Sequence, residues 1–187
     1  MMSKGLKAQF VLTEQENQSF FEHYANLDAP DVASKTTFAD SRKLYYRELA
    51  ARFGYLNAIT WNIGEENGWD DNTVYGQSND TQDRLDFATY LDELLPYQDQ
   101  IVVHNPIASP GDDIFTGISG LAPFSGVSLQ GYFDQTSWGH DKVLYWRNNS
   151  VSANRPWIIS YDEPYTSAVY PDIDTWRKDS VWAAFTA

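Results

Sequence analysis

Short apolar segments with the composition of β-strands alternate along this chain with segments that have helical spacing. The strand-like segments span residues 7–13, 58–63, 100–104, 126–130 and 157–161. Helical patterns occupy residues 38–53, 81–95, 114–118, 140–148 and 172–187. Regular alternation of this kind predicts an α/β fold, in which a parallel sheet is connected by crossover helices.

Polar side chains suited to chemistry stand at the ends of these predicted strands. They are Glu14, the adjacent Glu65 and Glu66, His104, Gln130, and the adjacent Asp162 and Glu163. A (β/α)8 barrel places its chemistry at the carboxyl ends of its strands. A doubly wound sheet would more typically carry a glycine-rich phosphate loop after its first strand, and this sequence has none. The pattern therefore favours a barrel.

The number of strands is too small for a complete barrel. A (β/α)8 barrel needs about 250 residues, whereas this chain has 187 residues and about five predicted strands. We therefore expect residues 1–187 to form a single, partial (β/α)8 TIM-barrel domain.

Gly64 follows the strand 58–63 directly and predicts a sharp turn before Glu65 and Glu66.

Composition excludes several classes of partner. A formal net charge of −13 argues against nucleic-acid binding, because a phosphate backbone would be repelled. No apolar run approaches the ~20 residues that a membrane span requires. The chain has no cysteine and no recognisable cofactor or metal-ligand motif, so we expect neither a cofactor nor a metal.

Aromatic residues make up 16% of the chain, and Trp and Tyr provide surfaces on which sugar rings stack.

Carboxylates at two separate strand ends suggest the hydrolysis of glycosidic bonds. That reaction needs one carboxylic acid to protonate the leaving oxygen, and a second carboxylate that attacks the sugar or activates water. In the retaining form the two carboxyl groups lie roughly 5–5.5 Å apart, a separation that can be bridged across the mouth of a barrel. The expected partner is therefore a carbohydrate, either a polysaccharide or an oligosaccharide.

Two motifs resemble those of the clan A glycoside hydrolases. The stretch W-N-I-G-E-E-N, residues 61–67, resembles the fourth-strand motif that carries the general acid/base. This resemblance implies that Glu66 is the acid/base and that Glu65 replaces the usual Asn. The stretch R-P-W-I-I-S-Y-D-E-P, residues 155–164, resembles the seventh-strand motif and implies that Glu163 is the nucleophile, with Asp162 as the second choice.

A wider resemblance covers nearly the whole chain. The segments L-Y-Y-R-E-L-A-A-R-F-G, I-V-V-H and G-V-S-L-Q, together with the two motifs above, are similar to multidomain bacterial proteins. These proteins combine an immunoglobulin-like domain of unknown function, a glycosidase-like barrel and a domain named for collagen binding. The resemblance implies a fragment from about the third barrel strand to the helix after the seventh. The rest of a secreted or periplasmic parent protein would supply the missing strands.

Further residues are candidates for binding substrate. Trp61 and Asn62 alternate along one strand, so one of them points into the barrel and the other toward the helices. The complete set of substrate-binding candidates is Glu14, Trp61, Asn62, Glu65, His104, Gln130 and Asp162. Two alternatives to a glycosidase stay open: a carbohydrate-binding barrel without catalysis, suggested by Glu65 in place of Asn, and an inactive truncated fragment.

Overall fold

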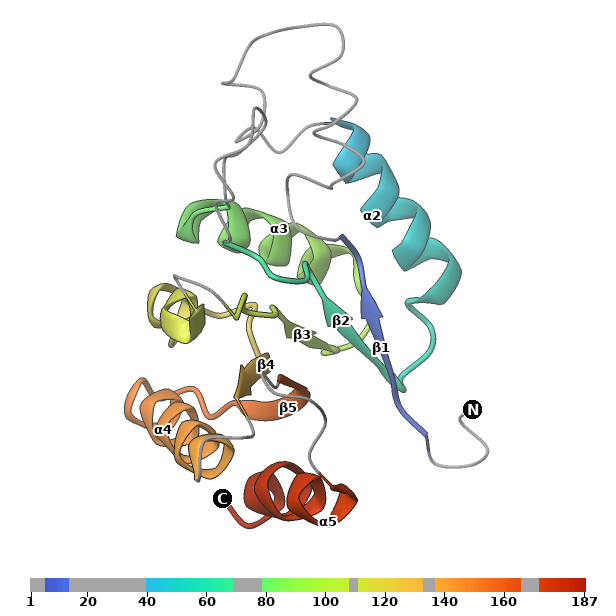
Figure 1. The fold of residues 1–187 in the computed structure, drawn as a ribbon. Helices are drawn as coiled ribbons and strands as arrows, with labels where there is room; N and C mark the ends of the chain where they lie inside the picture. The colour runs from blue at the N-terminus through green and yellow to red at the C-terminus, as the bar shows by residue number, and fades with distance from the viewer. Residues whose placement is uncertain (1–5, 14–39, 69–78, 108–110, 133–136, 166–171) are drawn as a thin grey trace, which may run out of the picture.

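A computed structural model describes residues 6–13, 40–68, 79–107, 111–132, 137–165 and 172–187 (Figure 1). The strands are β1 (Ala8–Val11), β2 (Ile59–Asn62), β3 (Gln100–Val102), β4 (Gly126–Tyr132) and β5 (Ile158–Tyr165). The helices are α2 (Asp40–Phe53), α3 (Thr81–Leu94), the 3-10 helix η4 (Gly111–Ile118) and α4 (Trp138–Ser152). The last helical segment comprises α5 (Ile173–Trp176), the π-helical turn η5 (Arg177–Trp182) and α6 (Ala183–Phe185). The predicted order of strands and helices is confirmed.

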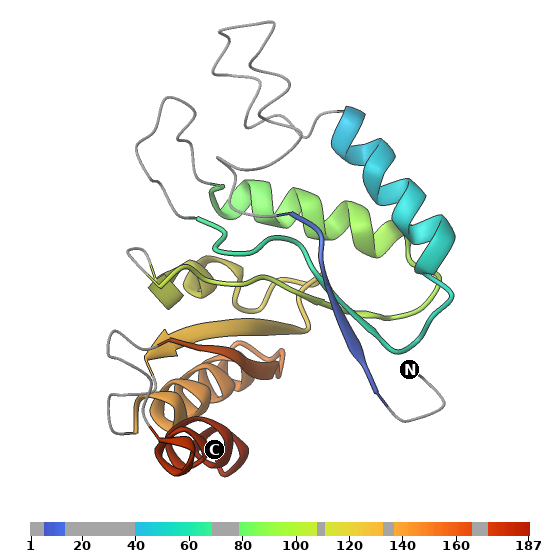
Figure 2. The same cartoon turned by 45° about the vertical axis from the view of Figure 1, so that its right-hand side comes forward.

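The strands form two open parallel sheets, one with the order β1-β2-β3 and the other with β4-β5 (Figure 2). An isolated parallel bridge between His104 and Ser128 connects the two sheets. At the same seam the Ser128 amide donates to the Val103 carbonyl at 3.0 Å. The α/β class is therefore confirmed, with neighbouring strands following one another in chain order.

Alternation along the strands separates a helix-covered face from a concave face. Trp61 is fully buried, and its ring meets that of Phe10 with the centroids 5.7 Å apart. Phe10 in turn contacts Phe53 of α2, with the ring centroids 5.6 Å apart. Asn62, one position after Trp61, lies on the opposite, concave face because successive strand residues point to opposite sides.

The concave face is strongly curved, because side chains from the first and last strands touch across it. Gln9 Nε2 on β1 donates to Asp162 Oδ2 on β5 at 2.9 Å. In a flat sheet four inter-strand spacings would separate these strands by roughly 19 Å, which is too far for Gln and Asp side chains to bridge. The strands therefore form a concave surface, but the two sheets are open and the described strands do not close into the predicted barrel.

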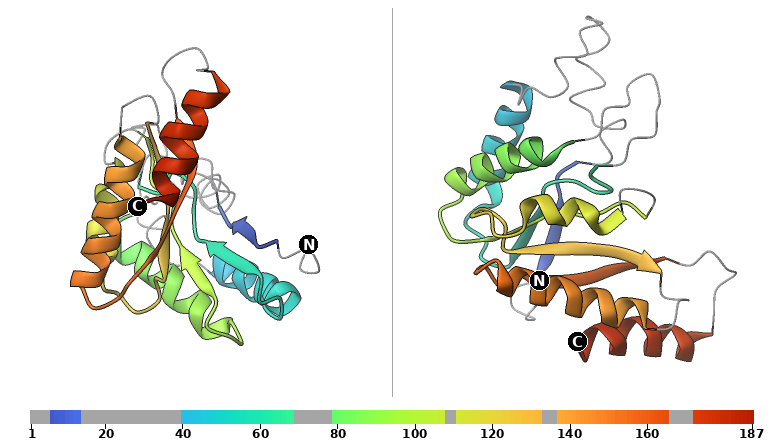
Figure 3. Two further views of the ribbon diagram at one scale, coloured as in Figure 1. Left: turned by 90° about the horizontal axis from the view of Figure 1, so that it is seen from below. Right: turned by 90° about the vertical axis from the view of Figure 1, so that its left-hand side faces the viewer.

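The helices cover the convex side of the strands, and a capping residue in the sequence explains where α3 begins. Asp80 caps α3 by accepting from the amides of Gln82 and Asp83, as is common for an Asp directly before a helix. The α4 helix packs against β4 and β5, and the C-terminal helical segment lies beside α4 (Figure 3). Within the described ranges, none of the helices is long and apolar enough to cross a lipid bilayer.

Candidate functional site

A cavity of about 310 Å³ lies on the concave side, toward the carboxyl ends of the strands. Side chains from both sheets line it, and most of them are polar or acidic. The described lining residues are Gln9, Val11, Asn62, Glu65, His104, Ser128, Asp162 and Glu163. The cavity therefore gathers residues that are widely separated in the sequence.

A bulge in β5 determines how its two carboxylates reach this cavity. Tyr161 pairs with Leu129, and Glu163 pairs with Gln130, so that Asp162 is the extra residue opposite β4. In a regular strand Asp162 and Glu163 would point to opposite faces, but the added residue changes the alternation. Both side chains therefore line the same cavity. The carboxylates lie within β5, which continues to Tyr165, and not after its end as the sequence suggested.

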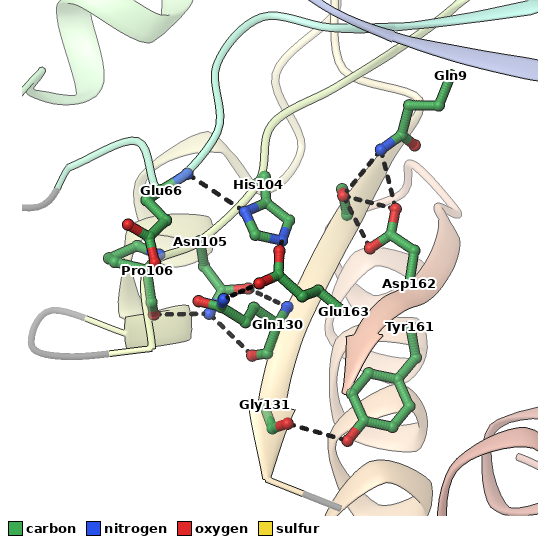
Figure 4. A network of polar contacts seen from close by, with 11 residues as sticks. Gln9, Glu66, His104, Asn105, Pro106, Gln130, Gly131, Tyr161, Asp162 and Glu163 are labelled. Carbon is green, nitrogen blue, oxygen red and sulfur yellow. Dashed lines mark hydrogen bonds and ion pairs between the residues drawn. The ribbon is translucent and has the colours of Figure 1, made fainter. Parts of the chain in front are cut away.

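The Glu163 carboxylate is held by two neighbours on adjacent elements (Figure 4). Gln130 Nε2 donates to Glu163 Oε1 at 2.6 Å, and His104 Nε2 lies 3.4 Å from Glu163 Oε2. Asn105 fixes the Gln130 backbone, because Asn105 Nδ2 donates to the Gln130 carbonyl and Asn105 Oδ1 accepts from the Gln130 amide. The orientation of Glu163 is thus set by a buried amide network.

The protonation of His104 follows from its contacts. Its Nδ1 accepts the backbone N–H of Glu66 at 3.2 Å, so Nδ1 carries no hydrogen and the proton of the neutral ring lies on Nε2. Burial lowers the pKa of His104, although the nearby carboxylates of Asp162 and Glu163 partly oppose that shift. His104 is therefore a neutral donor that faces Glu163.

Asp162 joins three strands. Its oxygens accept from Ser128 Oγ at 2.9 and 2.8 Å, and Oδ2 also accepts from Gln9 Nε2. Gln9 Nε2 lies 3.2 Å from Ser128 Oγ as well, so the three polar groups form a closed cluster. Asp162 consequently anchors the bulge that presents Glu163.

The loop that carries Glu65 and Glu66 is held on both sides. The Glu65 amide donates to the Thr13 carbonyl at 2.9 Å, and the Asn67 amide donates to the His104 carbonyl at 3.0 Å. The residue with left-handed backbone is Glu66, whose φ is 45°, and not Gly64. Gly64 is required for space, because a Cβ there would lie 2.7 Å from Asn67 Nδ2. The predicted turn thus exists, with the unusual backbone two residues later than expected.

A buried arginine supports this loop from behind. Arg84 Nη1 of α3 donates to Asn67 Oδ1 at 3.2 Å and to the Asn79 carbonyl at 2.6 Å. Desolvation by burial lowers the pKa of Arg84 to about 10, which leaves the guanidinium charged at neutral pH. The end of β2 is therefore tied to α3 by a charged hydrogen bond.

The predicted site residues fall into separate groups in the structure. Five of them line the cavity: Asn62, Glu65, His104, Asp162 and Glu163. Gln130 supports Glu163, whereas Glu66 lies across the His104 ring from Glu163 in the view of Figure 4 and is not among the described lining residues. Trp61 is fully buried on the helix-covered face and is not brought to the cavity. Glu14 lies outside the described residues.

Sequence reasoning missed three residues of this site: Gln9, Asn105 and Ser128. Gln9 and Ser128 are polar residues inside apolar strands, and such positions signal a polar interior face. Asn105 directly follows His104, and nothing in the sequence connects it with Gln130.

Within the described ranges, no group of three or more His, Cys, Asp or Glu side chains is arranged to hold a metal ion.

Comparison with known proteins identifies no relative. No protein-family model matches the chain, and neither the curated proteins nor the solved structures contain a match to it. A functional assignment therefore depends on the residues and geometry of the cavity.

Proposed function

We propose that this chain is a glycoside hydrolase-like domain that cleaves glycosidic bonds of a polysaccharide or oligosaccharide by a retaining, two-carboxylate mechanism. The observation that carries the proposal is the placement of Glu163 and Glu65 in one polar cavity, with Glu66 beside it. Hydrolysis with two carboxylates requires acidic groups from opposite sides of a cleft, without a cofactor. Carboxylates from β5 and from the loop after β2 fit this requirement.

Glu163 is suited to the role of nucleophile. Gln130 donates to one of its oxygens and His104 Nε2 lies 3.4 Å from the other, which fixes the direction from which the carboxylate approaches the anomeric carbon of a sugar. The leaving oxygen then takes a proton from the opposing carboxylic acid, which afterwards acts as base toward the incoming water.

Two residues compete for the role of acid/base. The motif resemblance assigns it to Glu66, whereas the cavity geometry favours Glu65, whose side chain lines the same cavity as Glu163. The adjacent positions make a direct comparison possible, because Glu→Gln nearly preserves size and replaces the ionisable carboxyl group with a neutral amide. The variant that loses turnover identifies the acid.

We also propose that the two sheets are part of a (β/α)8 barrel. Parallel strands in chain order, helices on the convex side and the Gln9–Asp162 contact all favour this arrangement. A groove of about 550 Å³ between β5 and the C-terminal helical segment exposes apolar side chains, among them Val181 and Phe185. Further strands from a longer parent protein would cover such a groove.

The test of the proposed function is turnover of a panel of aryl glycosides and polysaccharides by the wild-type chain and three variants. Glu163→Gln should reduce turnover by about 10²–10⁴-fold, and one of Glu65→Gln and Glu66→Gln should do the same. Glu93→Gln on the exposed face of α3 serves as the matched control and should leave turnover unchanged. Retention of anomeric configuration in the first product, followed by NMR, checks the mechanism. Full activity of Glu163→Gln would refute it.

A second candidate is a carbohydrate-binding barrel without catalysis. The position of Glu66 favours it, because the residue that the motif resemblance assigns as acid/base lies outside the described cavity lining. In that case the wild-type chain binds oligosaccharides without turnover, and Glu66→Gln leaves their affinity unchanged.

A further inference from the structure

The two β5 carboxylates in the cavity are held only by neutral donors in the described contacts. Asp162 accepts from Ser128 and Gln9, Glu163 accepts from Gln130, and the neutral His104 lies with its Nε2 3.4 Å from Glu163 Oε2. None of these donors carries a compensating positive charge. The hydrogen bonds orient the carboxylates, and their negative charge remains directed at whatever occupies the cavity.

No Lys or Arg occurs among the described residues that line this cavity. Lys7 precedes β1, and its Nζ donates to Gln100 Oε1 at 2.7 Å, near the amino ends of the strands. Arg84 lies behind the Glu65–Asn67 loop, where it bonds to Asn67 and Asn79. Both of these cationic groups are thus engaged with other partners.

We propose that the cavity selects sugars without acidic groups: it accepts neutral and ammonium-bearing sugars and rejects uronates and sulfated sugars. This inference rests on the proposed carbohydrate-processing function and adds the substrate class. A sugar carboxylate or sulfate within a few ångströms of Asp162 and Glu163 would meet two like charges in a partly desolvated site. An ammonium group would find two acceptors instead. Repulsion of a competing ligand is an established route to specificity.

The experiment uses the full chain on a glycan array that contains neutral, amine-bearing, uronate and sulfated glycans. Glycans that bind are then compared by calorimetry with partners that differ only in charge, such as short cello-oligosaccharides, their C6-oxidised uronate forms and chitosan oligosaccharides. We expect the uronate form to bind at least about tenfold more weakly than its neutral partner. This difference in affinity between the neutral and the uronate ligand should persist at about 0.5 M salt, where the repulsion from the distant surface charge is screened.

Variants separate the local carboxylates from the overall negative charge. Asp162→Asn should reduce the difference in affinity between the neutral and the uronate ligand by several-fold. Asp92→Asn removes the same charge from the exposed face of α3 and should leave this difference unchanged. The salt series on the wild-type chain gives an independent readout if Asp162→Asn does not fold.

The outcomes distinguish this inference from the function on which it rests. Binding or turnover of acidic glycans at least as strong as that of neutral ones would overturn the charge selectivity and leave the carbohydrate function intact. Loss of the affinity difference at high salt would also overturn the proposed selectivity of the cavity, because the discrimination would then come from the net charge of the protein. Absence of any bound or hydrolysed glycan would overturn both.

Discussion

Gln9 and Asp162 are 153 positions apart in the chain, yet the Gln9 side-chain amide donates to the Asp162 carboxylate at 2.9 Å. The two residues belong to the first and last strands, which share no backbone pairing in the described sheets. Their contact spans the concave side and holds Asp162 in the bulge beside Glu163. The geometry of the candidate site therefore depends on a bond between opposite ends of the strand order.

We expect this contact to stabilise the fold measurably. A double-mutant cycle with Gln9→Ala and Asp162→Ala should give a coupling free energy of about 1 kcal/mol, as for a hydrogen bond to a charged group at a partly exposed site. Urea denaturation of the four proteins provides the measurement. The exposed pair Glu48 and Arg52 on α2 is the control, with an expected coupling of about 0.3–0.5 kcal/mol. Zero coupling for Gln9 and Asp162 would mean that the strands are not joined this way in solution.

The stability of the protein should depend on pH through His104. Burial lowers the pKa of His104 below its ordinary value of 6.5, so between the two values the unfolded chain binds a proton that the folded chain does not. The contribution of His104 to the free energy of unfolding is therefore complete above about pH 6.5. It is lost as the pH falls toward the folded-state pKa of His104.

Urea denaturation across pH 5–7.5 measures this effect. His104→Gln should flatten the dependence of the unfolding free energy on pH in this window. An unaltered slope in His104→Gln would show that His104 titrates alike in the folded and unfolded states.

Gly64→Ala should destabilise the loop that carries Glu65 and Glu66. The added methyl group would lie 2.7 Å from Asn67 Nδ2 and 3.1 Å from Thr13 Oγ1, and both neighbours are held in place. We expect a cost of about 1–3 kcal/mol in the free energy of unfolding. The cost should be smaller when Asn67→Ala is already present, because the tighter contact is then removed. Equal costs in the two backgrounds would contradict this explanation.

Trp61 should contribute to stability and not to carbohydrate binding. Its side chain is fully buried against Phe10 on the helix-covered face. Trp61→Phe should lower the free energy of unfolding by about 1–3 kcal/mol and leave oligosaccharide affinity unchanged at temperatures where the variant is folded. Thermal denaturation and calorimetry check the two halves of this prediction. Weaker binding by a fully folded variant would restore Trp61 as a substrate contact.

Local patterns were sufficient to predict the elements and their order. Apolar runs marked the strands, and helical spacing of apolar residues marked the helices between them. The same reasoning indicated that either Trp61 or Asn62 faces the interior. It could not choose between them, because that choice depends on which face of the strand the helices cover.

The sequence by itself determined the α/β class, the parallel strand order and the position of carboxylates near strand ends, because these follow from local periodicity and from short motifs. The tertiary structure alone decided that Asp162 occupies a bulge, that Gln9 reaches across to it, and that Glu66 adopts left-handed backbone. Each of these features depends on register and contacts between distant strands. No local pattern encodes such pairings, since they exist only once distant strands have been brought together.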